Sequence, residues 1–397
     1  MGLTTPAHAE RGHALLGASK ASQWINCPPS ARAQEGIPDT RSEFANEGTA
    51  AHELSELILR RQLQEGADVD RLDREIETFE TVEPYYNAEM GAAVAAYVEV
   101  VEERFMDAKA RSADAVILFE ARLDFTEWVP EGYGTGDVVI IADGVMEVID
   151  LKYGKGVPVS AIGNPQIRLY GLGAWSDYSY LYDIHEVHGT IVQPRLDSVS
   201  TEPLPIDELL HWAERIVKPA AALAHAGKGD FAAGDHCRWC KIKGSCRARA
   251  DANMAALAYE FRDPVTLSLE EIGSILHVAE QLSAWAKDVS DYAFTATKAG
   301  QQVPGWKLVE GRSDRKITDK NQAIQLFSEA GLVPEKYLKP PEILGIGKLE
   351  SSIGKKELVE ILGGLIVKPP GKPALVPETD KRPELNSVEG DFEGEDF

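Results

Sequence analysis

Residues 136–152 read GDVVIIADGVMEVIDLK, and this stretch decides the fold. Two apolar segments flank Asp143 and Gly144, and an Asp-Gly pair in such a position is a strong signal for a two-residue β-hairpin turn. With that turn, Asp137 falls directly opposite Asp150. Paired positions share one face of a sheet and lie about 4.5–5.5 Å apart at Cβ. The sequence therefore predicts two carboxylates side by side on neighbouring strands.

Such a pair has a chemical consequence, because like charges directly opposite each other destabilise a sheet. A divalent metal would compensate for both charges, and Mg²⁺ prefers oxygen ligands of this kind. Lys152 lies two residues beyond Asp150 and points to the same face. A metal that activates water, with a lysine that orients it or stabilises developing charge, suits phosphodiester hydrolysis. The alternative is an exposed hairpin end with a surface Lys–Asp pair.

The periodicity of apolar residues predicts helices and strands around this hairpin. We expect helices over 43–63, 83–109, 164–180, 206–226 and 267–299, and strands over 115–123, 136–142, 145–152 and 185–194. Helices, three strands, a helix, a strand and a helix form a mixed α/β core of about 200 residues, within the ordinary size of a domain. The predicted fold class is therefore α/β.

Composition limits the protein's class. The 397 residues carry a net charge of -23, which argues against a general nucleic-acid binder, although residues 236–249 are locally basic. No apolar run is long enough to cross a membrane, and the first residues do not resemble a secretion signal, so we expect a cytoplasmic protein. Four cysteines are too few for a disulfide framework and suit metal or redox chemistry.

The order Asp137, then Asp150-Leu151-Lys152, resembles the D…(D/E)-x-K core of the PD-(D/E)XK nucleases. That resemblance implies a restriction-endonuclease-like fold, a mixed sheet flanked by helices. It also implies that Asp137 and Asp150 bind Mg²⁺ or Mn²⁺ and that Lys152 assists catalysis.

Two flanking motifs are similar to those of the RecB-like branch of this family. Gly48-x₃-His52 lies upstream of the hairpin and Gln166-x₃-Tyr170 lies downstream. The resemblance implies that His52 is a further metal ligand and that Gln166 and Tyr170 line the DNA path beside the catalytic residues.

Two other residues near these motifs allow more than one interpretation. Glu56, four residues after His52, is expected to be an acid of the helix surface rather than a support for the histidine. Lys155 is either a phosphate contact or an ordinary loop lysine.

The cysteines are Cys27 and, much later, Cys237-x₂-Cys240-x₅-Cys246. This spacing resembles the iron staple of AddB-type nuclease domains and CRISPR-associated RecB-like exonucleases, which implies a 4Fe-4S cluster held by all four thiolates. A Cys₄ zinc site, a redox C-x-x-C pair and unliganded cysteines are the alternatives. A redox pair leaves Cys27 and Cys246 unexplained.

The expected organisation has three parts. Residues 1–250 form the RecB-like nuclease domain, residues 251–367 form an accessory region, and residues 368–397 form a disordered acidic tail. The layout also looks like a phage and prophage group that joins such a nuclease to an additional C-terminal region. No G-x₄-G-K-[ST] motif is present, so a stand-alone nuclease is expected.

These observations favour a metal-dependent DNA exonuclease that acts on DNA ends or single strands in phage recombination, repair or replication, in the cytoplasm of a bacterial host. The acidic, phenylalanine-ended tail allows recruitment of a partner such as a single-strand-binding or recombination protein, or is simply solvated. One alternative is a catalytically inactive DNA-binding or assembly factor with a nuclease fold. Another is an iron–sulfur or zinc interaction module, which does not explain the facing aspartates.

Overall fold

The structure is a computed structural model, and it describes residues 14–38, 43–257 and 269–309, with four single positions beyond them: Gly354, Lys356, Ile361 and Leu362. The chain divides into two compact units, Met1–Thr318 and Asp319–Phe397. All elements described below belong to the first unit. The predicted tail, residues 368–397, lies outside the described residues.

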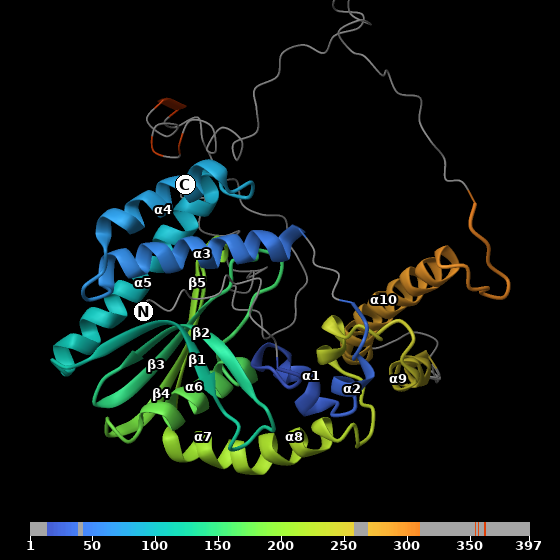
Figure 1. Ribbon diagram of the computed structural model, residues 1–397. Coiled ribbons are helices and arrows are strands. Elements are labelled where there is room, and N and C mark those ends of the chain that lie inside the picture. Colours follow the sequence, from blue (N-terminus) through green and yellow to red (C-terminus); the bar gives the residue numbers. More distant parts are fainter. Residues whose placement is uncertain are drawn as a thin grey trace, which may run out of the picture. The chain divides into compact units, whose positions relative to one another are not determined.

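A five-stranded mixed sheet forms the centre of this unit (Figure 1). Its order follows the sequence: β1 (Val116–Asp124), β2 (Tyr133–Ile141), β3 (Gly144–Leu151), β4 (Ile184–Gln193) and β5 (Ser198–Pro205). Neighbouring strands are antiparallel except β3 and β4, which are parallel. A parallel pair needs a crossover, and α6 (Pro165–Tyr178) supplies it.

Helices cover both faces of the sheet. In Figure 1, α3 (Glu43–Leu63), α4 (Val69–Val82) and α5 (Ala88–Arg111) lie on one side. Helix α6 lies on the other side with α7 (Ile206–Trp212) and α8 (Lys218–His225). The short helices α1 (Ala21–Asn26) and α2 (Ser30–Ala33) precede this core, and α9 (Arg247–Leu257) and α10 (Leu269–Lys298) follow it. The predicted α/β class is confirmed.

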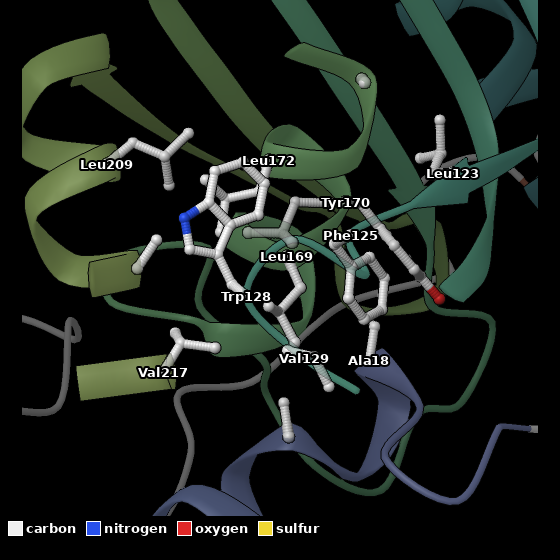
Figure 2. Packing of buried hydrophobic residues seen from close by; sticks show 14 of the residues in the cluster. Ala18, Leu123, Phe125, Trp128, Val129, Leu169, Tyr170, Leu172, Leu209 and Val217 are labelled. Carbon is white, nitrogen blue, oxygen red and sulfur yellow. The ribbon is translucent and has the colours of Figure 1, made fainter. Parts of the chain in front are cut away.

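The apolar hairpin strands feed two hydrophobic cores, because alternate residues point to opposite faces. Val139 and Met146 belong to the core under α6, whereas Val138 and Ile149 belong to the core under α3 and α5. Figure 2 shows part of the first core, where Trp128 lies near leucines of α6 and α7. Burial on both faces explains why the strands read as nearly continuous apolar runs.

The sequence did not predict α2, α4, β5 or α9, and two of these, α4 and β5, belong to the layers of the core. Helix α4 buries only Leu72 and Phe79 along its length, so its apolar pattern is sparse. The Asp68 side chain caps it by accepting from Arg71 N. Strand β5 is an edge strand that contains Pro203 and Pro205, residues that usually argue against a strand.

The single helix predicted over 206–226 has an irregular centre. A π-helical turn, Ala213–Val217, joins α7 to α8. Pro219 follows this turn, and it lacks the N–H that would donate to the carbonyl four residues earlier. The chain accommodates the proline with a wider turn and keeps the buried face of Val217, Ala221 and Ala224 continuous. Among the described helices, none is long and apolar enough to span a membrane.

One glycine sets how closely α6 approaches the sheet. A methyl group at Gly173 would meet Leu123 Cβ at 2.9 Å and the backbone of the same residue at 3.1 Å. Overpacking costs about 1–3 kcal/mol, while alanine's better helix propensity returns up to about 1 kcal/mol. We therefore expect Gly173→Ala to lower the free energy of unfolding in chemical denaturation.

Gly48→Ala in α3 is the matched control, because a methyl group there meets no atom within 4 Å. This change should leave the free energy of unfolding unchanged or raise it by up to about 1 kcal/mol. Equal stabilities for the two variants would contradict the close approach of α6 to β1.

Candidate functional site

The predicted hairpin is present with the predicted register. Ala142 and Val145 exchange backbone hydrogen bonds of 3.2 and 3.3 Å across Asp143-Gly144, and Gly144 has a φ of +85°. The ladder then pairs Ile141 with Met146 and continues outward to Val138 and Ile149. The next position in this register joins Asp137 and Asp150.

The backbone ladder between β2 and β3 ends before this position, where a side chain of β2 accepts a hydrogen bond from the backbone of β3. Asp137 Oδ2 accepts a hydrogen bond of 2.7 Å from the backbone N–H of Leu151. The Asp137 side chain thus accepts the hydrogen bond that a backbone carbonyl of β2 would accept in a continued ladder. This bond fixes the carboxylate of Asp137 against the end of β3, beside Asp150.

A pocket of about 370 Å³ opens at this end of the hairpin. Six residues singled out from the sequence line it: His52, Asp137, Asp150, Lys152, Gln166 and Tyr170. They come from α3, β2, β3, the residue after β3, and α6. The fold therefore gathers into one cavity side chains that lie up to 118 positions apart (170 − 52) in the sequence.

Each carboxylate has a cationic or imidazole partner. His52 Nδ1 lies 3.1 Å from Asp137 Oδ1, and Lys152 Nζ lies 2.7 Å from Asp150 Oδ2. Gln166 Nε2 donates to Asp150 Oδ1 and to the Tyr170 hydroxyl, both at 3.3 Å. Gln166 and Tyr170 are one helical turn apart, so one face of α6 presents both.

The charges of the pocket shift the pKa values of its groups in different directions. Burial acts to lower the pKa of His52, but the charge and hydrogen bond of Asp137 outweigh it and raise this pKa to about 9. Burial acts to raise the pKa of Asp137, but His52 and the Leu151 N–H bring it below its ordinary value. Burial raises the pKa of Asp150, which Lys152 offsets only in part. Burial therefore makes the charged form of the Asp150 carboxylate unfavourable in this pocket.

Two observations indicate that these groups fit a divalent cation. Asp150 Oδ2 is buried and lies 2.7 Å from the Lys152 ammonium group, which is its only close cation among the described residues. In addition, ligand atoms of His52, Glu120 and Asp137 all lie within 4.8 Å of one another. Buried carboxylates with an imidazole beside them are the ligand chemistry of Mg²⁺ or Mn²⁺. The pocket is a candidate divalent-metal site.

Glu120 is the member of this group that sequence reasoning missed. The β1–β2 ladder pairs Phe119 with Val138 and Ala121 with Gly136, and it skips Glu120 and Asp137 between them. Glu120 also has a positive φ of 51°, which is unusual for a residue with a side chain. Backbone strain of this kind concentrates at functional sites. The available signal was a lone acid within the apolar segment 115–123.

The two uncertain residues lie in other interactions. Glu56 accepts a hydrogen bond of 2.8 Å from Arg60, one turn further along α3, in keeping with an acid of the helix surface. Lys155 Nζ lies 3.4 Å from Glu89 Oε1 at the start of α5. Neither residue lines the pocket.

The four cysteines meet around a small cavity that shares no lining residue with this pocket. Cys27 ends α1, Cys237 and Cys240 lie in and just after a 3₁₀ turn (η5, Asp235–Trp239), and Cys246 directly precedes α9. All four are free thiols; Cys246 is half-buried and the other three are buried. The fold thus brings the N-terminal cysteine to the other three across about 210 residues of sequence, and a cross-link over so long a loop restricts the unfolded chain strongly in theory.

The surroundings of this cavity act differently on its thiols. Burial acts to raise the pKa of Cys27 and of Cys237, but the neighbouring His236 brings both below their ordinary value. Burial raises the pKa of Cys240, and the other thiols add to this shift. The surroundings therefore favour the thiolate form at Cys27 and Cys237 and disfavour it at Cys240.

The spacing of the sulfurs bears on which group they could hold. Four thiolates around one zinc at about 2.3 Å would lie within roughly 4 Å of one another. No three of the four Sγ atoms, all within the described part of the chain, come within 4.8 Å of each other. A cluster of several irons holds its cysteines further apart than a single ion does. The donor set suits either group, and the spacing does not have the form of a single-ion site.

The raised pKa of His52 can be measured in protein freed of divalent metal by EDTA. We expect the His52 ring to titrate near pH 9 by NMR, and Asp137→Asn to bring its pKa toward or below the ordinary value of about 6.5. A raised pKa stabilises the fold fully below the unfolded-state pKa, and this contribution is lost as pH rises through 9. Asp137→Asn should therefore destabilise more at pH 6 than at pH 10.

Asp143→Asn, an exposed change in the hairpin turn, serves as the control and should leave the His52 titration unchanged. A His52 ring that titrates near 6.5 in the parent protein would contradict the His52–Asp137 interaction.

Comparison with known proteins gives matches to solved structures and to a protein family. The solved structure titled "Crystal structure of SSO0001" is 12% identical, and the match covers 57% of this chain and 96% of that chain. Its TM-score of 0.20 is too low to support an argument about the site. Residues 13–383 match a family described as "Protein of unknown function (DUF2800)". Because this match spans nearly the whole sequence, the chain belongs to the DUF2800 family.

Proposed function

We propose that this protein is a divalent-metal-dependent deoxyribonuclease, with an exonuclease acting on DNA ends or single strands as the favoured form. The observation that carries the proposal is the arrangement around Asp150 Oδ2. This buried oxygen is paired with Lys152 and lies in one open pocket with the group formed by His52, Glu120 and Asp137.

In this proposal His52, Glu120, Asp137 and Asp150 hold Mg²⁺ or Mn²⁺. Such a metal, when bound, lowers the pKa of a water ligand and neutralises charge on the phosphate. The buried carboxylates fix where it sits, because Asp137 is tied to Leu151 N and Asp150 to Gln166 Nε2. Two carboxylates held by backbone and side-chain donors lose little conformational freedom on binding.

Lys152 has the second chemical role. Its pKa is above the ordinary value: burial acts to lower it, but the Asp150 charge outweighs that, so the ammonium form persists across the physiological range. An ammonium group at this position orients the attacking water or stabilises the charge that develops on the phosphate oxygens. In this proposal it acts as a positioned cation rather than as a base, in keeping with its raised pKa.

Gln166 and Tyr170 form the wall on the α6 side. Gln166 Nε2 bridges Asp150 Oδ1 and the Tyr170 hydroxyl, so it aligns the carboxylate with the α6 side of the pocket. Burial raises the pKa of Tyr170, which keeps its hydroxyl protonated as a donor. We propose that both side chains contact the substrate strand next to the scissile phosphate.

We propose further that the four cysteines hold a 4Fe-4S cluster. Support comes from four thiols around one cavity, two of them with lowered pKa. The cluster would join α1 to the segment before α9.

The catalytic proposal is tested with end-labelled DNA and Mn²⁺. We expect Asp150→Asn, Glu120→Gln and Lys152→Ala each to slow cleavage by roughly 10²–10³-fold, the usual cost of one electrostatic contact to the transition state. Lys218→Ala is the matched lysine control, because Lys218 pairs with Glu214 on the surface of α8. It should cleave at the parent rate.

Melting temperature and iron content of each variant show whether it is folded. Parent-like cleavage by folded Asp150→Asn protein would refute the nuclease assignment. Binding of DNA without metal-dependent cleavage in the parent protein would favour an inactive nuclease-fold DNA-binding factor.

The cluster proposal is tested on protein purified without oxygen. We expect about four irons per chain and a broad visible absorption in the parent, and loss of both in Cys27→Ser and Cys240→Ser. Removal of the cluster should also lower the melting temperature, since the tie between distant segments is lost. One zinc per chain and no visible absorption would contradict the iron–sulfur assignment while leaving the nuclease proposal intact.

A further inference from the structure

A second cavity, of about 200 Å³, lies directly beside the catalytic pocket. The two cavities share Ala14 and Lys20 among their lining residues, so they are neighbours along one surface. The walls of the second cavity come from α1, α2 and the cysteine segment, by which we mean residues 237–246. They include Gln23, Ser30, Gln34 and Lys241. None of these residues belongs to the metal group.

Lys20 stands at the junction of the two cavities. It ends a 3₁₀ turn (η2, Ala18–Lys20) that is held firmly, because Ala18 and Ala21 are buried and Trp24 Nε1 donates to Gly17 O at 3.2 Å. The side chain of Lys20 is exposed. A positioned ammonium group next to a phosphodiester-cleaving pocket is suited to the neighbouring backbone phosphate.

The amide of Gln34 ties the wall of this cavity together. Its Oε1 accepts a hydrogen bond of 2.8 Å from the backbone N–H of Lys241, and its Nε2 donates to Gln23 Oε1 at 3.1 Å and to Ser30 O at 2.9 Å. The cysteine segment is therefore fixed against α1 and α2 along the cavity that begins at Lys20.

The cysteine segment carries an aromatic and cationic surface just beyond Lys241. Trp239 is 70% exposed, and the guanidinium of Arg238 lies 5.4 Å from the centre of its ring. An exposed tryptophan with cations beside it is the combination by which proteins bind single strands, through base stacking and phosphate contacts. A double helix keeps its bases stacked inside and cannot use such a surface in this way.

We propose that a single-stranded nucleic acid runs from the catalytic pocket past Lys20, along the second cavity, to a stacking platform at Trp239. Lys20 contacts the backbone phosphate next to the scissile one, and Trp239 stacks on a base further along the strand. The inference rests on the proposed nuclease function, since it names the strand path of that site. The cysteine segment thereby becomes part of the substrate-binding surface.

The test uses the full-length, metal-free Asp150→Asn protein and a fluorescent oligothymidine strand, with Kd measured over a series of salt concentrations. We expect Trp239→Ala to weaken binding roughly fivefold to a hundredfold, the effect of losing one stacked base. Trp239→Phe should restore most of the affinity. Lys20→Ala should lower the slope of log Kd against log salt by about 0.7, the value for one phosphate contact on a single strand.

Trp306→Ala and Lys218→Ala are the matched controls, because both side chains are exposed and line neither cavity. They should bind as the Asp150→Asn parent does. Binding of a blunt duplex should be insensitive to Trp239→Ala. Iron content and melting temperature of the Trp239 variants check that the cysteine segment is intact.

Two outcomes separate this inference from the nuclease proposal. If the wild-type protein cleaves DNA while Trp239→Ala and Lys20→Ala bind the strand like their parent, the strand path is wrong and the nuclease stands. If the wild-type protein never cleaves but both variants lose binding as expected, the strand path stands and the hydrolysis proposal fails.

Discussion

The site depends on two aspartates that a β-hairpin forces together inside the protein. Asp137 and Asp150 occupy the same rung of the β2–β3 register, with apolar cores on both faces of the strands leading to them. Burial of like charges is unfavourable, and the fold offsets it with His52 on one carboxylate and Lys152 on the other. The charges of the pair are therefore balanced by partners from α3 and from the residue after β3 rather than by the hairpin itself.

The sequence predicted this pair because hairpin register is a local property. Two residues at the turn, Asp143 and Gly144, set every pairing outward, and the observed ladder follows it. The register between β1 and β2 is not local in this way, since a loop of several residues separates them. Glu120 therefore could not be aligned with Asp137 from sequence. Its positive-φ backbone is likewise a result of tertiary packing.

The same distinction explains which elements were predicted. Helix α3 was found to its exact bounds because its apolar face is packed on the sheet, whereas α4 packs mainly on α3 and buries few side chains. Strand β5 carries prolines that only an edge position tolerates, and being an edge is a property of the sheet rather than the segment. In this protein, a segment was predictable where many of its own apolar side chains are buried.

The N-terminal segment connects the two special sites of the molecule. Within residues 17–30 the chain provides Lys20 at the catalytic pocket, Trp24 in the main core, and Cys27 at the cysteine cavity. Its helices are too short to be stable alone, so tertiary contacts must hold them. A cross-link at Cys27 would fix this segment from one end while Trp24 anchors its middle. The same segment lines the pocket through Gly17, Ala18 and Lys20, so a bond at Cys27 would act on the geometry of that wall.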